Sequence, residues 1–234
     1  MNVTWTNVIP GLWRSDYVTK TAIDAVSYVV ALADGEIAVV SPPGSADDAL
    51  FAFTDQFGKV TALVANNVGH DLGQELWQKR YPDSVTYAPE VAVAKIAKAK
   101  KALRPIQPLS ALQNKLPPNV RFVDVAGTTS GMTVFSVDAG EGGRALFVDE
   151  IISNSPTLIG PLPFKFIFWL TGSGPGLARS KVWTALFAKD KAGVARTVLA
   201  EIDRLQPTVV LPGHGNPILP EQFSDLRALL TAIA

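Results

Sequence analysis

The chain contains no cysteine, and its 234 residues include only two histidines and two methionines. The absence of cysteine excludes disulfide bonds, thiolate nucleophiles and zinc sites that use cysteine. Charged residues make up 18% of the chain and the formal net charge is zero, so no basic field is available to attract nucleic acid. No uninterrupted apolar run reaches the roughly 18 residues expected of a membrane-spanning helix.

The rest of the composition is typical of a protein that folds around a buried core. Hydrophobic residues make up 47% of the chain, and 234 residues suffice for one large domain or two small ones. Residues 1–7 contain neither the basic region nor the apolar segment of a signal peptide. We therefore expect a soluble, cytoplasmic protein with a small-molecule substrate or ligand, without a nucleic-acid partner or a transmembrane segment.

The two histidines occupy similar places in the sequence. His70 follows an apolar run at residues 60–65, which we predict as a buried strand, and precedes a helical pattern around Trp77. His214 lies between two glycines and follows a second apolar run at residues 208–211. Because α/β proteins place their chemistry in loops that follow strand ends, we expect the two imidazoles to converge on one cleft.

Strand and helix patterns alternate along the chain, and each half begins with predicted hairpins. Asp34-Gly35 between two apolar runs is a strong hairpin signal, and the Pro-rich residues 106–118 predict irregular structure. The other predicted strands cover residues 60–65, 84–87, 120–125, 132–137, 144–148 and 208–211. One predicted helix begins after Ser45, and the others cover residues 75–81, 89–103, 180–188, 191–205 and 221–233. This pattern predicts an α/β chain that forms one domain over residues 1–234, a four-layer αββα sandwich of two mixed sheets. Its pseudo-symmetric halves would cover about 1–105 and 119–234.

Residues 156–171 form an apolar segment with several aromatic side chains. Prolines at 156, 161 and 163 argue against a long straight helix here. We expect this segment to form an apolar wall of the cleft, or an interface with a second subunit in a homodimer. Burial in the core is the alternative.

Six short motifs resemble the metallo-β-lactamase fold superfamily in the order in which they occur. They are I-P-G-L-W-R at 9–14, V-V-S-P-P-G at 39–44, N-N-V-G-H-D at 66–71, A-G-T-T-S-G at 126–131, L-F-V-D at 146–149 and L-P-G-H-G at 211–215. The third resembles the family's H-x-H-x-D-H motif, the fourth its P-G-H-T-x-G motif, and the last its P-G-H-G motif. The resemblance covers nearly the whole chain. It implies the αββα fold and a site for one or two metals, usually zinc or iron.

The same motifs depart from the family at its first metal position. Asn66 and Val68 stand where the family has two histidines, Thr128 stands where it has a third, and Pro42 replaces its early Asp. Valine cannot bind a metal, and threonine is a poor ligand for zinc. The resemblance therefore implies that a dinuclear centre is lost and that the chain does not hydrolyse β-lactams at rates typical of the named enzymes.

The second metal position keeps suitable side chains. His70 and Asp71 resemble the family's Asp-His pair in reversed order, Asp149 stands at the bridging carboxylate, and His214 stands at the final histidine. The resemblance implies that these four residues hold at most one ion, zinc, iron or manganese, with His70 and Asp71 as catalytic residues. The metal would lower the pKa of a water molecule, which would then act as the nucleophile.

The substrate and the activity follow from this site. Candidate pocket residues are Asn66, Asn67, Thr128 and Trp169. The first hypothesis is a hydrolase-like enzyme that acts on a small ester, lactone or amide-like substrate.

The second hypothesis is an inactive member of the fold that binds a ligand or a protein partner without a metal. In that case His70 and His214 hydrogen-bond within a dead site, and Asp71 merely caps the following helix. Asp149 then ends a strand or pairs with Arg144. In either hypothesis we expect Glu150 to be a surface residue.

Overall fold

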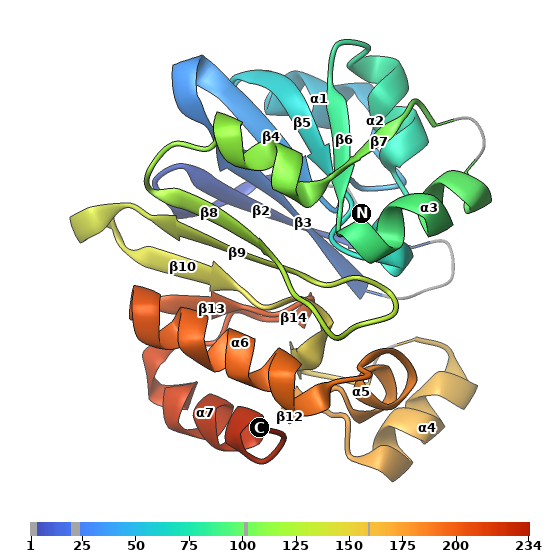
Figure 1. Ribbon diagram of the computed structural model, residues 1–234, viewed down its shortest axis with the longest axis vertical. Helices are drawn as coiled ribbons and strands as arrows, with labels where there is room; N and C mark the ends of the chain where they lie inside the picture. Colours follow the sequence, from blue (N-terminus) through green and yellow to red (C-terminus); the bar gives the residue numbers. More distant parts are fainter. Residues whose placement is uncertain (1–3, 20–23, 101–102, 159) are drawn as a thin grey trace.

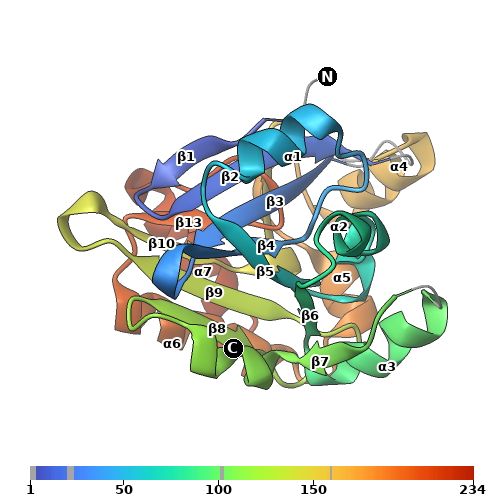
Figure 2. The same cartoon turned by 90° about the horizontal axis from the view of Figure 1, so that it is seen from above.

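The computed structural model describes residues 4–19, 24–100, 103–158 and 160–234, which are called the described residues below. Helices lie on the two outer sides and strands lie between them, so the molecule has four layers (Figures 1 and 2). This arrangement confirms the predicted αββα sandwich. Within the described residues no helix is long and apolar enough to cross a membrane.

The first sheet contains seven strands in sequence order. They are β1 (Thr6–Ile9), β2 (Leu12–Val18), β3 (Asp24–Ala31), β4 (Glu36–Val40), β5 (Lys59–Val64), β6 (Val85–Ala88) and β7 (Ile106–Pro108). Neighbouring strands are antiparallel from β1 to β4 and parallel from β4 to β7. The predicted Asp34-Gly35 hairpin joins β3 to β4 through a 3-10 turn, as expected.

The second strand layer is divided into two sheets rather than the single sheet predicted. The larger has the order β13 (Val209–Leu211), β10 (Arg144–Phe147), β9 (Thr133–Asp138), β8 (Val120–Asp124). The smaller has the order β12 (Gly176–Arg179), β11 (Ile152–Ser155), β14 (His214–Gly215). The division arises because 3-10 helix η5 (Asp149–Ile151) separates β10 from β11, and a Pro-Gly pair separates β13 from β14.

The helices are α1 (Asp48–Thr54), α2 (Gln74–Arg80), α3 (Glu90–Ala99), α4 (Leu162–Thr171), α5 (Lys181–Phe187), α6 (Lys191–Leu205) and α7 (Phe223–Thr231). Six of the helices were predicted, most of them with shifted ends, whereas α4 lies in residues 156–171, where no helix was predicted. The cap of α1 is Asp47 rather than Ser45, because the Asp47 carboxylate accepts a hydrogen bond from the Leu50 backbone N–H at 2.8 Å. Residues 106–118, predicted as irregular, instead contain β7 and 3-10 helix η3 (Leu109–Lys115).

Among the described residues, four apolar clusters fill the spaces between the layers, and the smallest packs Ala65 and Ala88 of the first strand layer against Ala92 and Ile96 of α3. Strand side chains alternate between the two faces of a sheet, so neighbouring residues of one strand enter different clusters. In β3, Tyr28 lies between the two strand layers, where its ring contacts Phe135 and Phe147 at centroid distances of 5.5 and 5.2 Å. Val29 faces the other way and packs with Trp77 of α2. The remaining cluster joins the second strand layer to α5, α6 and α7.

Candidate metal centre

Three loops meet at one edge of the sandwich because of the strand directions. His70 follows β5, Glu150 follows β10, and His214 follows β13. Strands β10 and β13 are parallel, so their carboxyl ends lie at the same edge and bring Glu150 beside His214. The rings of His70 and His214 lie 5.8 Å apart between centroids, which confirms the predicted convergence of the two imidazoles.

His70 ends the short 3-10 helix η2 (Val68–His70), and its orientation is fixed from two sides. The side-chain oxygen of Asn67 caps η2 by accepting a hydrogen bond from the Gly69 backbone N–H at 2.7 Å. The Ser41 hydroxyl, at the end of the parallel neighbour β4, lies 2.6 Å from His70 Nδ1. The resemblance places the family's supporting Asp at Pro42, but here the preceding residue, Ser41, takes that place beside the imidazole.

His214 is held by its backbone and by one ring nitrogen. Gly213 and Gly215 permit close approach of other chain segments. A Cβ at Gly213 would lie 2.9 Å from the Asp149 carbonyl oxygen, and a Cβ at Gly215 would lie 2.2 Å from the Asn154 carbonyl oxygen. The Nδ1–H of His214 donates to the backbone carbonyl of Asp24 at 2.5 Å. This hydrogen bond leaves Nε2 directed toward the third member of the group.

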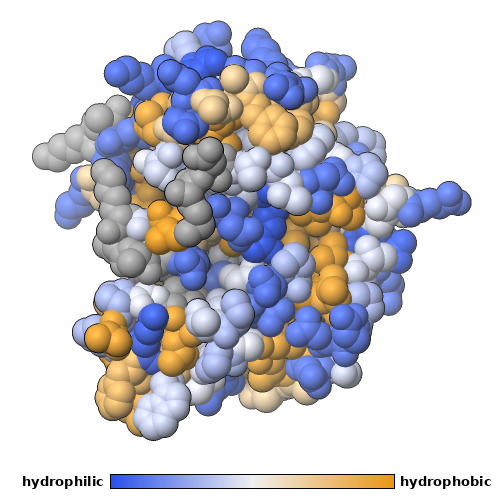
Figure 3. All heavy atoms as spheres, turned by 180° about the vertical axis from the view of Figure 1, so that it is seen from behind, coloured by the Kyte–Doolittle hydropathy of each residue, from blue (hydrophilic) through white to orange (hydrophobic). Residues whose placement is uncertain are grey.

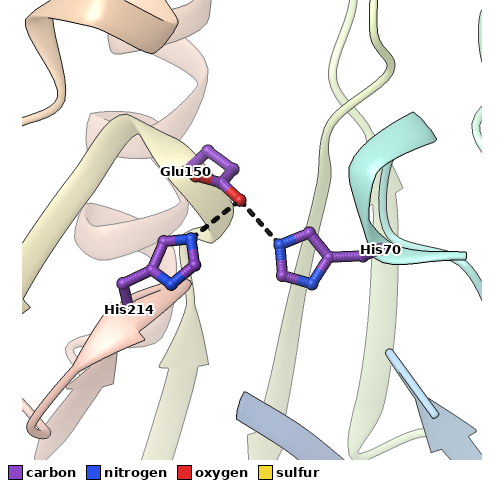
Figure 4. Close-up of side chains that lie close together, drawn as sticks. All are labelled: His70, Glu150 and His214. Atoms are coloured by element: carbon purple, nitrogen blue, oxygen red, sulfur yellow. Dashed lines mark hydrogen bonds and ion pairs between the residues drawn. The ribbon is translucent and has the colours of Figure 1, made fainter. Parts of the chain in front are cut away.

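Glu150 is that third member (Figure 4). Its Oε1 atom lies 2.6 Å from His70 Nε2 and 3.2 Å from His214 Nε2. Each of the three side chains offers one ligand atom, and these atoms all lie within 4.8 Å of one another. Among the described residues, they form the group of histidine and carboxylate side chains that could hold a metal ion. The prediction of Glu150 as a surface residue is therefore wrong, because its side chain is only 15% exposed.

The charges of the trio stabilise one another. Burial alone would raise the pKa of Glu150, but His214 and His70 together hold this pKa well below its usual range. Burial alone would lower the pKa of His214, but the Glu150 carboxylate raises it to about 9. Without a metal, Glu150 and His214 therefore form an ion pair at neutral pH.

Asp149, a predicted ligand, lies outside this trio. It is fully buried, and its carboxylate accepts hydrogen bonds from Asn66 Nδ2 at 2.6 Å, Asn67 Nδ2 at 3.0 Å and the Thr133 backbone N–H at 3.2 Å. Its backbone has φ 50°, a left-handed conformation that is uncommon for residues other than glycine. This turn directs Asp149 between the strand layers and leaves the next residue, Glu150, facing the histidines.

Asp71, the other predicted ligand and catalytic residue, is also outside the trio. It is the first residue after η2, and its backbone carbonyl accepts a hydrogen bond from the Gln74 backbone N–H. Because Asp71 lies outside η2, its carboxylate is not placed by that helix, and its oxygens are not among the ligand atoms that converge with those of His70. Burial raises the pKa of the Asp71 carboxyl.

Two cavities border the trio. A cavity of about 450 Å³ reaches Glu150 and His214, and its far wall is formed by Phe164 and Phe168 of α4 with Val182, Trp183, Leu186 and Phe187 of α5. A second cavity of about 230 Å³ is lined by all three members of the trio together with Tyr17. The trio thus separates a large apolar space from a smaller one.

The predicted pocket residues are only partly placed in these walls. Asn67 lines the large cavity, whereas Asn66 is fully buried in the Asp149 network. Thr128 is buried, pairs with Ala188 through a backbone bridge and lines neither cavity. Trp169 is 62% exposed on the outer side of α4, because a helix that lies over a cavity turns only one face toward it. The predicted apolar wall within residues 156–171 is confirmed, with Phe164 and Phe168 as its members.

Comparisons with known proteins identify the fold. No family model matches the chain, and no curated protein sequence matches it. The metallo-β-lactamase DIM-1 is 15% identical with a TM-score of 0.67, and the match covers 100% of this chain and 99% of that one. The mono-zinc form of FIM-1 from Pseudomonas aeruginosa is 16% identical with a TM-score of 0.63, over 99% of this chain and 96% of that one. The metal-soaked Flv1 flavodiiron core from Synechocystis sp. PCC6803 is 14% identical with a TM-score of 0.62, over 98% of this chain and 61% of that one.

Proposed function

We propose that this chain, which has the metallo-β-lactamase fold, is a hydrolase whose residues His70, Glu150 and His214 hold a single metal ion. The observation that carries the proposal is the convergence of two Nε2 atoms on one carboxylate oxygen, at 2.6 and 3.2 Å. The predicted ligand set is thus revised: Glu150 replaces Asp149, and Asp71 is omitted.

The donor set suits a catalytic metal. Catalytic zinc sites use three protein ligands and keep one position open, and two histidines with one carboxylate are also typical of non-haem Fe(II) sites. Metal-binding histidines usually have their second ring nitrogen occupied, as Nδ1 is here by the Asp24 carbonyl and the Ser41 hydroxyl. A metal bound there would polarise a carbonyl oxygen and lower the pKa of water.

The chain's own residues would position the substrate. A small ester, lactone or amide would enter the large cavity, where the apolar wall from α4 and α5 excludes water around it. Its carbonyl group would lie at the inner end, where Glu150 and His214 line the same cavity. The smaller cavity, on which all three members of the trio open, would supply water from the other side.

Metal analysis with activity assays tests this proposal. Protein purified without chelator should contain about one transition metal per chain, and it should hydrolyse p-nitrophenyl esters or lactones in a chelator-sensitive manner. His214→Ala should lose both metal and activity. Asp71→Asn, a matched change of a neighbouring buried acid outside the trio, should retain the metal. Metal-free protein, or equal metal content in His214→Ala and the parent chain, would contradict the proposal.

A second candidate function is ligand binding without chemistry. The observation in its favour is that Glu150 already pairs with both histidines, so the trio satisfies its own hydrogen bonds without an ion. A chain that contains no metal and still binds small apolar molecules would support this candidate. The homodimer and the cytoplasmic location predicted from the sequence stay predictions.

A further inference from the structure

The outer wall of the large cavity is apolar. Its outer side is formed by six apolar side chains, two from α4 and four from α5: Phe164, Phe168, Val182, Trp183, Leu186 and Phe187. Its inner end reaches Glu150 and His214. A cavity of about 450 Å³ is within the range of small-molecule sites.

Three of the neutral polar side chains along this cavity, whose lining also includes Ser153 and Ser180, already have hydrogen-bond partners within the protein. Asn67 accepts from the Gly69 N–H and donates to Asp149. The Ser130 hydroxyl donates to the Gly131 carbonyl, and the Ser173 hydroxyl accepts from the Lys181 N–H. A sugar or a peptide, which needs many hydrogen bonds, would therefore lose its contacts with water and gain few in return.

The helix that closes the cavity also exposes apolar side chains outward. None of the residues of α4 is buried, and hydrophobic side chains gather over α4 at the lower left of Figure 3. Phe166 and Trp169 are 60% and 62% exposed and do not line the cavity, whereas Phe164, which is 50% exposed, and Phe168 do line it. Helix α4 thus carries two groups of aromatic side chains with different surroundings.

We propose that the large cavity is a binding site for a linear hydrocarbon chain, so that the natural substrate is a lipid-like acyl ester or acyl lactone. The alkyl chain lies between α4 and α5, and the carbonyl group at its end reaches the trio. This substrate class rests on the proposed hydrolase function, but the alkyl site itself does not require a bound metal. Binding of inert alkyl compounds to chelator-treated protein therefore tests it separately.

The test uses a series of methyl ketones, from butanone to dodecan-2-one, titrated into chelator-treated full-length protein and followed by calorimetry. Burial of each added methylene should tighten binding about fourfold until the cavity is full. Affinity that does not change with chain length would overturn the proposal.

Variants of α4 supply a matched pair for this series. Phe164→Gln should weaken binding of the longer ketones about tenfold, because it places an amide in the apolar wall. Phe166→Gln, the same change two residues along the same helix, should leave binding unchanged. Equal losses in both variants would contradict a specific wall.

Val182→Phe tests whether the size of the cavity sets the length of the alkyl chain that can bind. The larger side chain should fill part of the cavity, so the gain in affinity with each added methylene should stop at a shorter ketone. The affinity for the shortest ketones should not change. An unchanged length limit in this variant would count against the proposal.

The alkyl site and the hydrolase function can fail separately. Length-dependent ketone binding by a protein that contains no metal when it is purified without chelator would support the alkyl site and contradict the hydrolase function. A bound metal together with ketone binding that does not depend on chain length would support the metal site and contradict the alkyl site.

Discussion

Asp149 and Glu150 are adjacent in the chain but belong to two different regions of the molecule. Asp149 lies in a closed polar network that joins the two strand layers, because Asn66 and Asn67 follow β5 and Thr133 begins β9. Glu150 lies between two imidazoles at the border of two cavities. The first carboxylate is enclosed by hydrogen-bond donors, and the second is accessible to a ligand.

The difference shows how positions that the resemblance assigns to metal ligands can instead belong to a hydrogen-bonded network. The resemblance implies imidazoles at the positions of Asn66 and Thr128. In this chain Asn66 donates to Asp149 instead, and the Thr128 hydroxyl is buried without a hydrogen-bond partner among the described residues. Asn66 thus contributes to the stability of the fold, whereas under the proposed function the neighbouring trio supplies the metal ligands.

The largest expected effect concerns stability. Asp149→Ala would leave three buried donors unpaired, and each costs about 1–3 kcal/mol, so the free energy of unfolding should fall by about 4 kcal/mol. Glu150→Gln keeps the shape of the side chain, and its histidine partners can lose their protons and become neutral, so it should cost about 2 kcal/mol. Urea denaturation of chelator-treated protein measures both values. Equal losses would remove the distinction between the two regions.

The pH dependence of stability should report the ion pair of the trio in chelator-treated protein. The pKa of His214 in the fold is about 9, above its ordinary value of 6.5, so the protonated ring stabilises the fold. This contribution is complete below about pH 6.5 and is lost as the pH rises through 9, by roughly 3 kcal/mol. In Glu150→Gln the same pH range should show a much flatter curve of unfolding free energy. A parent curve that rises between these pH values would contradict the account.

Ser41 should affect metal affinity more than stability. Removal of a group that orients a metal-binding histidine typically weakens metal affinity about tenfold or more. We therefore expect Ser41→Ala to weaken metal binding about tenfold in a competition assay with a chromogenic chelator. Ser45→Ala, an exposed serine in the same loop, is the matched control and should have no effect. Equal affinities in the two variants would show that Ser41 does not orient His70.

The smallest effect is expected at Thr128. Its hydroxyl has no hydrogen-bond partner in the part of the chain that the structure describes, so Thr128→Val should leave the free energy of unfolding unchanged or raise it by up to about 1 kcal/mol. Metal content and ester hydrolysis should also stay the same, because Thr128 lines neither cavity. A marked loss of activity in this variant would return Thr128 to the substrate pocket.

The sequence predicted the fold because its signals repeat along the chain. Apolar runs for the strands, the Asp34-Gly35 hairpin and the amphipathic helices all agree with one layered arrangement. The helix predicted at residues 191–205 has the bounds observed for α6. Residues 106–118 were mispredicted because three prolines suggested irregular structure, yet Pro108 can end an edge strand without interrupting its ladder.

The site was predicted less completely because it depends on single backbone turns. The positions of His70 and His214 after strands indicated that they would converge. The choice between Asp149 and Glu150 depends on a left-handed φ at Asp149, and the choice between His70 and Asp71 depends on the 3-10 helix η2. No periodic pattern records these turns, although two consecutive acids at a strand end were a signal that either could face the cleft.

The most direct test of the central claim compares the two neighbouring carboxylates in one measurement. Metal content per chain should be determined for the parent protein, Glu150→Gln and Asp149→Asn, each purified without chelator and each verified as folded by circular dichroism. The account predicts about one metal per chain in the parent and in Asp149→Asn, and almost none in Glu150→Gln. Retention of the metal in Glu150→Gln together with its loss in Asp149→Asn would contradict the claim that Glu150 completes the metal centre.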